Sequence, residues 1–356
     1  MTANAQPLTV RRADPADLSS SDYQAAAHVY THARPGNPAT AALLAAADAA
    51  QAQAGATHAR WLAEVGGQVI GAAEIMEPLG SRSPGSFWLE LAVLSEWRGQ
   101  GAATALARAL KTELSLHAPA RVKAVVSEAN PVALRFAQKH GFVEVERFWD
   151  RTLELSGFDA ARYVRPLPEG IELTTLEQFA AQVPDMPSAL HPLNEEARAD
   201  LPRAPGEVHT PLPHSDMAAF LAPLDPSLVF LALRGGVPVG FTALEPSGTT
   251  GPSNTGLLTA RPALAHDPAK YELMIAMTGV ARTERRQGLA RALKLASMEA
   301  ARRAGWAVIR TSNHSGNMGM LRVNDALGFG REPARLGMLW TASAVRGNLR
   351  RELSGW

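Results

Sequence analysis

Two apolar-rich segments on either side of a Gly-Gly turn predict a β-hairpin at an equivalent place in each half of the chain. The turns are Gly66-Gly67 and Gly235-Gly236, and the apolar-rich segments beside them are residues 60–65, 68–75, 229–233 and 237–244. Two small residues between such segments are typical of a tight hairpin turn. The pattern therefore predicts the same antiparallel unit twice.

Apolar residues at helical spacing predict a long helix after a strand in each half. In the second half Leu289, Leu293, Ala296 and Ala300 form one apolar stripe. The expected long helices cover residues 101–117 and 288–304, the strands after them residues 122–127 and 308–311, and the shorter helices residues 131–140 and 318–327. Each half is thus expected to run strand, helices, three strands, helix, strand, helix, strand.

A short motif, Arg-x-x-Gly-x-Ala, precedes the long helix in both halves. Its residues are Arg98, Gly99, Gln100, Gly101, Ala102 and Ala103 in the first half, and Arg285, Arg286, Gln287, Gly288, Leu289 and Ala290 in the second. A glycine-containing turn at a helix N-terminus leaves backbone N–H groups unpaired at the positive end of the helix dipole. The motif therefore predicts up to two pyrophosphate-binding sites.

Three landmarks indicate that the motif belongs to an internal duplication. Arg98, Asn130 and Gly141 have counterparts of the same residue type 187 positions later, at Arg285, Asn317 and Gly328. One offset kept by three separate landmarks is the signature of a repeat. We expect domains at 1–165 and 166–344, followed by a C-terminal tail at 345–356.

Composition narrows the class of protein. A length of 356 residues suits two domains, and a net charge of +1 gives no electrostatic case for nucleic acid or a membrane surface as a partner. The absence of cysteine excludes disulfides, thiol nucleophiles and cysteine-based zinc sites. No signal-peptide pattern and no apolar run of about 18–20 residues is visible, so we expect a cytoplasmic protein.

The two motifs, each followed by an asparagine and then by Gly-Phe, resemble the GCN5-related N-acetyltransferases (GNAT family). The second half is the closer match, and the tandem arrangement is similar to the subgroup that includes mycothiol synthase-like proteins. This resemblance implies an α/β (α+β) fold of two tandem GNAT-type domains. Each domain would contain a mixed, mostly antiparallel sheet flanked by helices.

The resemblance also implies acetyl-CoA as the acyl donor and direct transfer without a metal. The turn amides would bind the pyrophosphate, and a strand edge would pair with the pantetheine arm, which carries amides. Beyond the two turns, the implied coenzyme-binding residues are Leu91, Ala92, Val93 and Asn130 in the first half, and Thr278, Gly279, Val280, Asn313 and Asn317 in the second. The two asparagines that begin the short helices, Asn130 and Asn317, are equally consistent with helix caps.

The catalytic residues are less clearly marked. Many family members place a tyrosine, as general acid, seven residues after the asparagine, where this chain has Ala137 and Asn324. Asn324 can donate only an amide hydrogen bond. Glu90 occupies a place where related enzymes often carry an acidic base, and its partner position is Met277. Glu245, on a hairpin strand, is a further candidate base.

The expected function is N-acetylation of a small-molecule amine, with the C-terminal half the more active, in a monomer or homodimer. Two alternatives remain open. The missing tyrosines would also suit an acyl-CoA-binding regulatory protein without turnover, and the acceptor could instead be a protein N-terminus or lysine. The sequence does not identify the acceptor.

Overall fold

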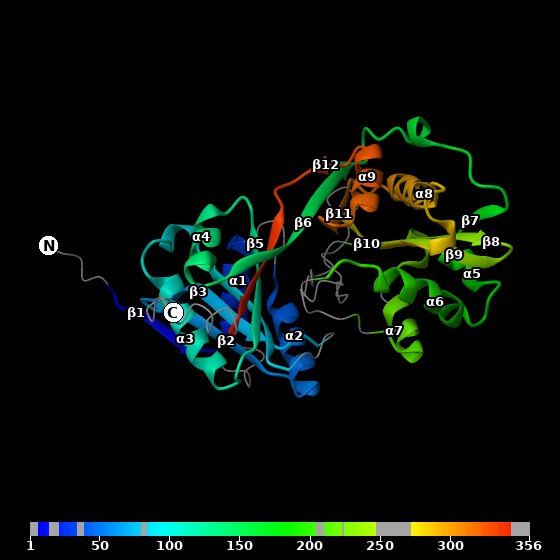
Figure 1. Ribbon diagram of the computed structural model, residues 1–356. Coiled ribbons are helices and arrows are strands. Elements are labelled where there is room, and N and C mark those ends of the chain that lie inside the picture. Colours follow the sequence, from blue (N-terminus) through cyan, green and yellow to red (C-terminus); the bar gives the residue numbers. More distant parts are fainter. Residues whose placement is uncertain are drawn as a thin grey trace. The chain divides into compact units, whose positions relative to one another are not determined.

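The computed structural model describes most of the chain and divides it into two compact units (Figure 1). The described residues are 6–13, 21–33, 39–79, 84–203, 209, 211–222, 224–246 and 272–342. The first unit holds the described residues up to Glu144 together with residues 337–342, and the second holds the described residues from Val145 to Leu336. The expected tail at 345–356 lies outside the described residues, and the expected boundary at 165/166 stays a prediction.

The first unit contains a mixed sheet between two sets of helices. Its strands are β1 (Leu8–Arg12), β2 (His58–Val65), β3 (Gln68–Met76), β4 (Ser86–Val93) and β5 (Arg121–Ser127). Neighbours are antiparallel from β1 to β4, and β4 and β5 are parallel. Its helices are α1 (Ser21–Ala33), α2 (Ala41–Gln53), α3 (Ala102–Ser115) and α4 (Pro131–Lys139).

The second unit repeats this arrangement. Its strands are β6 (Val143–Glu154), β7 (Ile171–Thr175), β8 (Val229–Arg234), β9 (Val237–Pro246), β10 (Glu272–Val280), β11 (Val308–His314) and β12 (Gly330–Arg331). The order β7-β8-β9-β10 is antiparallel, and β10 and β11 are parallel. Its helices are α5 (Leu176–Ala180), α6 (Met186–Ala199), α7 (Met217–Leu221), α8 (Leu289–Arg303) and α9 (Met318–Ala326). The predicted mixed, mostly antiparallel fold and its duplication are confirmed.

In both units the long motif helix packs closely on the middle of the sheet. A Cβ added to Gly71 on β3 would lie 3.1 Å from the Leu106 side chain of α3, and one added to Gly240 on β9 would lie 3.0 Å from the Leu293 side chain of α8. Residues on the opposite face contact the other helices: Ala72 packs with α1, and Phe241 packs with α5 and α6. Alternation along β3 and β9 therefore assigns each side chain to one helix layer.

The last strand beside each parallel pair comes from a distant part of the chain. Strand β6 directly follows α4, yet most of it lies in the second unit, where it pairs antiparallel with β11. Strand β13 (Arg335–Thr341) ends in the first unit, next to β5. Each compact unit is thus completed by a strand that sequence order would assign to the other half.

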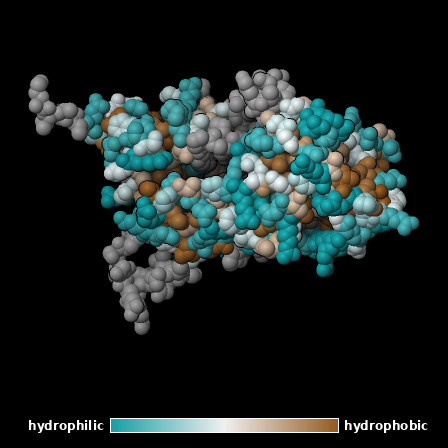
Figure 2. Space-filling view, turned by 90° about the horizontal axis from the view of Figure 1, so that it is seen from above, coloured by the Kyte–Doolittle hydropathy of each residue, from teal (hydrophilic) through white to brown (hydrophobic). Residues whose placement is uncertain are grey.

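The surface of the described chain is mixed in polarity. Figure 2 shows hydrophobic residues interspersed among hydrophilic ones on the face it presents. The large apolar side chains that are exposed, such as Leu116, Val132 and Val237, lie on separate elements. Among the described residues no helix is long and apolar enough to cross a membrane.

Candidate functional site

The two glycine turns have almost the same backbone geometry. Gly101 and Gly288 stand directly before α3 and α8 with φ of +90° and +88°, and neither helix start has a side-chain cap. A Cβ at either glycine would have no atom within 4 Å. The first N–H groups of both helices therefore have no side-chain cap, and the space beside each glycine is open, as a pyrophosphate site requires.

One turn position differs between the halves. Gly99 has φ of +78°, and its counterpart Arg286 has φ of +62°. A non-glycine residue in this left-handed region is strained, and such strain persists only where the surroundings enforce it. The second turn keeps this conformation while placing an exposed guanidinium at its outer edge.

The motif arginines brace the turns. Arg98 Nε donates to the carbonyl of Val93 at 3.2 Å, and Arg285 Nε donates to the carbonyl of Val280 at 2.9 Å. Each bond ties the turn back to the end of the strand before it. This structural role of the two arginines was not predicted from the sequence.

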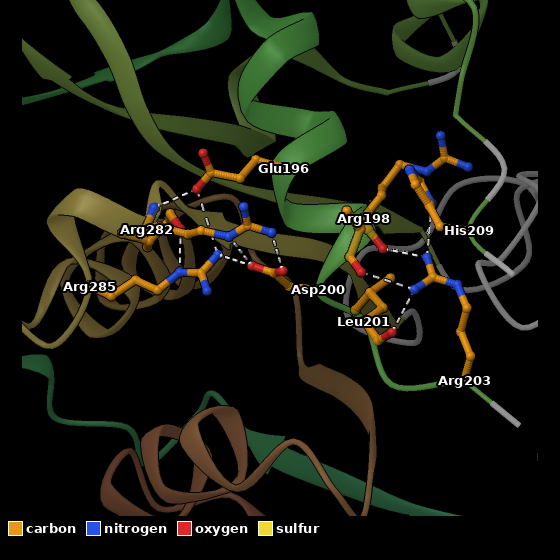
Figure 3. Close-up of polar contacts among 10 residues, drawn as sticks. Glu196, Arg198, Asp200, Leu201, Arg203, His209, Arg282 and Arg285 are labelled. Carbon is orange, nitrogen blue, oxygen red and sulfur yellow. Dashed lines mark hydrogen bonds and ion pairs between the residues drawn. The ribbon is translucent and has the colours of Figure 1, made fainter. Parts of the chain in front are cut away.

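Among the described residues, the second turn alone is also clamped to the opposite helix layer. Asp200, at the end of α6, accepts from Arg285 Nη2 at 2.6 Å and from Arg282 Nη2 at 2.5 Å, while Glu196 accepts from the backbone N–H of Arg282 (Figure 3). These arginines lower the pKa of Asp200 to about 2. The position matching Arg282 in the first half is Ser95, which cannot form such a pair.

The remaining predicted turn residues divide into packing and polar positions. Ala102 and Leu289 are 2% and 1% exposed, so both are packing positions. Gln100 Nε2 donates to the carbonyl of Glu96, and Gln287 Nε2 donates to Glu284, both within the turn. Ala103 and Ala290 lie in the first turn of each helix.

The parallel strands separate beside each turn. Strands β4 and β5 pair only at Ser86, Phe87 and Trp88, so Leu91, Ala92 and Val93 have no partner on the β5 side. Strands β10 and β11 pair only from Glu272 to Met274. We call the latter separation the β10–β11 split. Its β10 edge includes Thr278, Gly279 and Val280, whose opposite edge is paired to β9.

A β-bulge distinguishes the two splits. The β9–β10 register shifts between Ile275 and Met277, whereas β3 and β4 pair without a shift. The bulge adds one residue to β10, because Ser86 and Glu272 lie 186 apart whereas the turn residues lie 187 apart. Bulges re-aim side chains and backbone groups next to active sites, and only the second split has one.

Glu245 lies on β9 level with the closed end of the β10–β11 split. It is paired in register with Met274, the last β10 residue bonded to β11. It shares a face with Ala243 and Phe241, on the side of α6 and α7. Its carboxylate has no hydrogen-bond or ion-pair partner among the described residues, and burial raises the pKa of Glu245 to about 7. A carboxylate with that pKa can accept and release a proton near neutral pH.

In the first unit the acidic residue on this face is neutralised. Glu74 is 4% exposed and accepts from Arg60 Nη2 at 2.6 Å, and Arg60 also binds Asp48 of α2 at 2.9 Å. Burial raises the pKa of Glu74, but the charge of Arg60 and the contact with His58 outweigh it and hold the pKa at about 2. Glu90, the predicted base, is half-buried on β4 directly opposite Glu74.

Breaking this buried cluster should destabilise the first unit. In Arg60→Met, Asp48 and Glu74 would remain buried without their cation, so we expect a loss of about 3–5 kcal/mol in the free energy of unfolding. Urea denaturation measures it. Arg11→Met is the control, since Arg11 pairs with Asp22 while 44% exposed and should cost under about 1 kcal/mol. Equal small losses in both variants would contradict the expectation.

The asparagines predicted to bind the coenzyme have different structural roles. Asn130 and Asn317 cap α4 and α9, accepting from the N–H groups of Ala133 and Met320, so the helix-cap role is confirmed. Asn313 lies on β11 within the split.

Asn324 is fully buried in a polar cluster that the sequence did not reveal. Its Oδ1 accepts from Lys294 Nζ at 2.6 Å, and its Nδ2 donates to Asn313 Oδ1 at 2.6 Å. Both amide ends are therefore occupied, and direct contact of Asn324 with a leaving group would require these bonds to break. Burial, with the charge of Arg151, lowers the pKa of Lys294 to about 7.

The structure supplies no metal site among the residues it describes, where no group of three or more histidine or acidic side chains converges. The exposed turn amides and separated strands instead suit an extended ligand with an anionic end.

Comparison with known proteins agrees with this geometry. The model of the acetyltransferase (GNAT) family matches residues 24–142 and again residues 191–329. A GCN5-related N-acetyltransferase from Sphaerobacter thermophilus is similar over 94% of this chain and 95% of its own, with 19% identity and a TM-score of 0.64. A tandem GNAT protein from the clavulanic acid biosynthesis pathway covers 94% of this chain and 99% of its own, with 19% identity and a TM-score of 0.66. A search of curated protein sequences finds no match.

The two structural neighbours show the fold, and the family match covers most of both halves, including both turns. The chain therefore belongs to the GNAT acetyltransferase family, carries its fold twice in tandem, and uses that family's acyl donor, acetyl-CoA.

Proposed function

We propose that this protein is an N-acetyltransferase of a small-molecule amine, with its second unit as the productive site. The observation that carries the proposal is Glu245, whose carboxylate has no partner in the described part of the chain and a pKa of about 7, at the closed end of the β10–β11 split. The first unit has a matching turn and split, but the nearby carboxylate, Glu74, is neutralised by Arg60.

The donor would lie along the split. The pyrophosphate would bind the N–H groups of residues 286–290, and the pantetheine arm would follow Thr278 to Val280 toward the bulge. This direction brings the thioester toward Met274, where the strands converge. Glu245 stands at that level on the neighbouring strand.

The acceptor would approach from the α6–α7 face, where Glu245 points. Glu245 would take a proton from the amine as its nitrogen attacks the thioester carbonyl. The new C–N bond forms, the C–S bond breaks, and coenzyme A leaves as a thiolate. Catalysis would rest on alignment of amine and thioester together with this general base. Glu90, whose counterpart in the second half is Met277, is the candidate base of the first unit. The variant Glu90→Gln tests that role.

The acceptor class decides between this proposal and its alternatives. Acetylated product should form from acetyl-CoA with members of a panel of small primary amines, detected by mass spectrometry. Acetylation of peptides alone would identify a protein acetyltransferase. Acetyl-CoA binding without turnover on either panel would indicate a regulatory protein.

A further inference from the structure

The buried Lys294–Asn324–Asn313 cluster occurs in one half of the duplication only. The residues 187 positions earlier are Ala107, Ala137 and Val126. Those three fit the same fold with no polar group, so the fold does not need the cluster. Burying a lysine is costly unless its charge is compensated, and here all three positions became polar together.

The direction of the hydrogen bonds in this cluster is set by its lysine. An ammonium group has donors and no acceptor, so Asn324 must present Oδ1 to Lys294 and Nδ2 to Asn313. Asn313 must then present Oδ1 to Asn324, which directs its own Nδ2 away from the cluster. Asn313 is half-buried, and its Nδ2 has no partner among the described residues.

This free donor lies on the wall of the β10–β11 split. Asn313 is three residues beyond Arg310, the last β11 residue paired with β10, and so stands level with Thr278, because the bulge adds one residue to β10. That level is between the pyrophosphate turn and the closed end of the split. Hydrogen bonds arranged head to tail polarise one another, so a donor at the end of a chain that starts at a lysine is a stronger donor.

We propose that Lys294, acting through Asn324, polarises the Nδ2–H of Asn313 so that it stabilises the sulfur of coenzyme A as the C–S bond breaks. Lys294 and Asn324 are positioning residues, and no proton moves along the amides. The inference rests on the proposed function, because it assigns a role in the departure of the same thiolate. It also gives an electrostatic substitute for the tyrosine that the chain lacks.

An aromatic ring and a positive charge lie near the Lys294 ammonium group. Its Nζ lies 5.5 Å from the ring centroid of Phe329, and the positive charge of Arg151 on β6 acts on it. Arg151 is in turn ion-paired with Asp325 of α9. Since the pKa of Lys294 is held near 7, its polarising effect should be strongest below that pH and weaken above it.

The test measures the ionisation of the thiol in bound coenzyme A. The protein contains no cysteine, so thiolate absorbance in the complex reports only the coenzyme. The variant Lys294→Met/Asn324→Leu replaces both buried polar groups by side chains of similar size and leaves Asn313 able to turn toward water. We expect the thiol pKa in this complex to be about one unit higher than in the wild-type complex, a tenfold change in ionisation.

Turnover should change in parallel. We expect kcat to fall about tenfold with little change in KM for acetyl-CoA, because the affected bond strengthens only as the thiolate forms. Asn313→Ala removes the final donor from a half-buried position and should give the same two effects, with a loss of stability from the freed Nδ2 of Asn324 that thermal unfolding measures. Ser297→Ala, which removes another buried polar group of α8, should leave both values unchanged.

The possible results distinguish a failure of this inference from a failure of the proposed function. Equal thiol ionisation in wild type and Asn313→Ala, with acetyl transfer intact in wild type, would overturn this inference alone. Failure of the wild-type protein to bind coenzyme A would overturn the proposed function and the inference with it. If the double variant does not fold, thermal unfolding shows this and Asn313→Ala decides.

Discussion

Glu245→Gln should lower kcat about 100- to 10,000-fold while acetyl-CoA still binds. General-base catalysis contributes on this scale, and glutamine fills the same space without accepting a proton. Glu245 is unpaired among the described residues, so no ion pair is lost with it. Steady-state kinetics with the best amine found in the panel measures the loss, and calorimetry measures the retained affinity for acetyl-CoA.

The dependence of kcat/KM on pH should show in which protonation state Glu245 acts. A base must be deprotonated to act, and burial raises the pKa of Glu245 to about 7. The value of kcat/KM should therefore rise tenfold per pH unit below about 7 and stop rising above it. In Glu245→Gln this step should disappear.

Two matched variants separate catalysis from packing. Glu245→Asp keeps a carboxylate and should retain more activity than Glu245→Gln. Glu90→Gln makes the same change in the first unit and should have a much smaller effect. A profile for Glu245→Gln that keeps the step near pH 7 would show that another group is the base.

Gly288→Glu should abolish productive binding of acetyl-CoA in the second unit. Gly288 stands at the start of α8 with open space around it, so the new carboxylate would occupy the anion site and repel the pyrophosphate. We expect affinity at this site to fall at least about 100-fold, since charge repulsion adds to the loss of N–H contacts. Calorimetry reports both stoichiometry and affinity.

Two further variants, one at Gly288 itself and one at the equivalent glycine of the first unit, serve as controls for Gly288→Glu. Gly288→Gln imposes the same backbone strain at φ of +88° without the charge, and so isolates the repulsion. Gly101→Glu places the carboxylate at the equivalent position of the first unit and should leave most of the turnover intact. Equal loss of activity in Gly101→Glu and Gly288→Glu would show that the two units are equivalent.

Local features of this protein follow from its sequence. The hairpins at Gly66-Gly67 and Gly235-Gly236, the helix caps Asn130 and Asn317, and the turns before α3 and α8 all depend on residues close together in the chain. Glycine at positive φ and asparagine at a helix start act through their own backbone. Duplication supports each of these predictions, because the same local signal occurs twice.

Only tertiary structure decided which charged groups are available for chemistry. Glu74 and Glu245 look alike as acidic residues on hairpin strands, yet Arg60 and Asp48 surround one and no described side chain pairs with the other. The difference arises because the pKa of a carboxylate depends on burial and on charges brought near it by folding.

The same reason explains why the buried lysine and the strand exchange were not foreseen. Lys294 occupies a position on an amphipathic helix where only its contact with Asn324, 30 residues later, reveals a role. Strands β6 and β13 have ordinary strand patterns, but which sheet each one completes depends on pairing between distant segments. Sequence determined the repeated local units, and long-range packing decided which of the two carries a carboxylate without a partner among the described residues and a buried polar cluster.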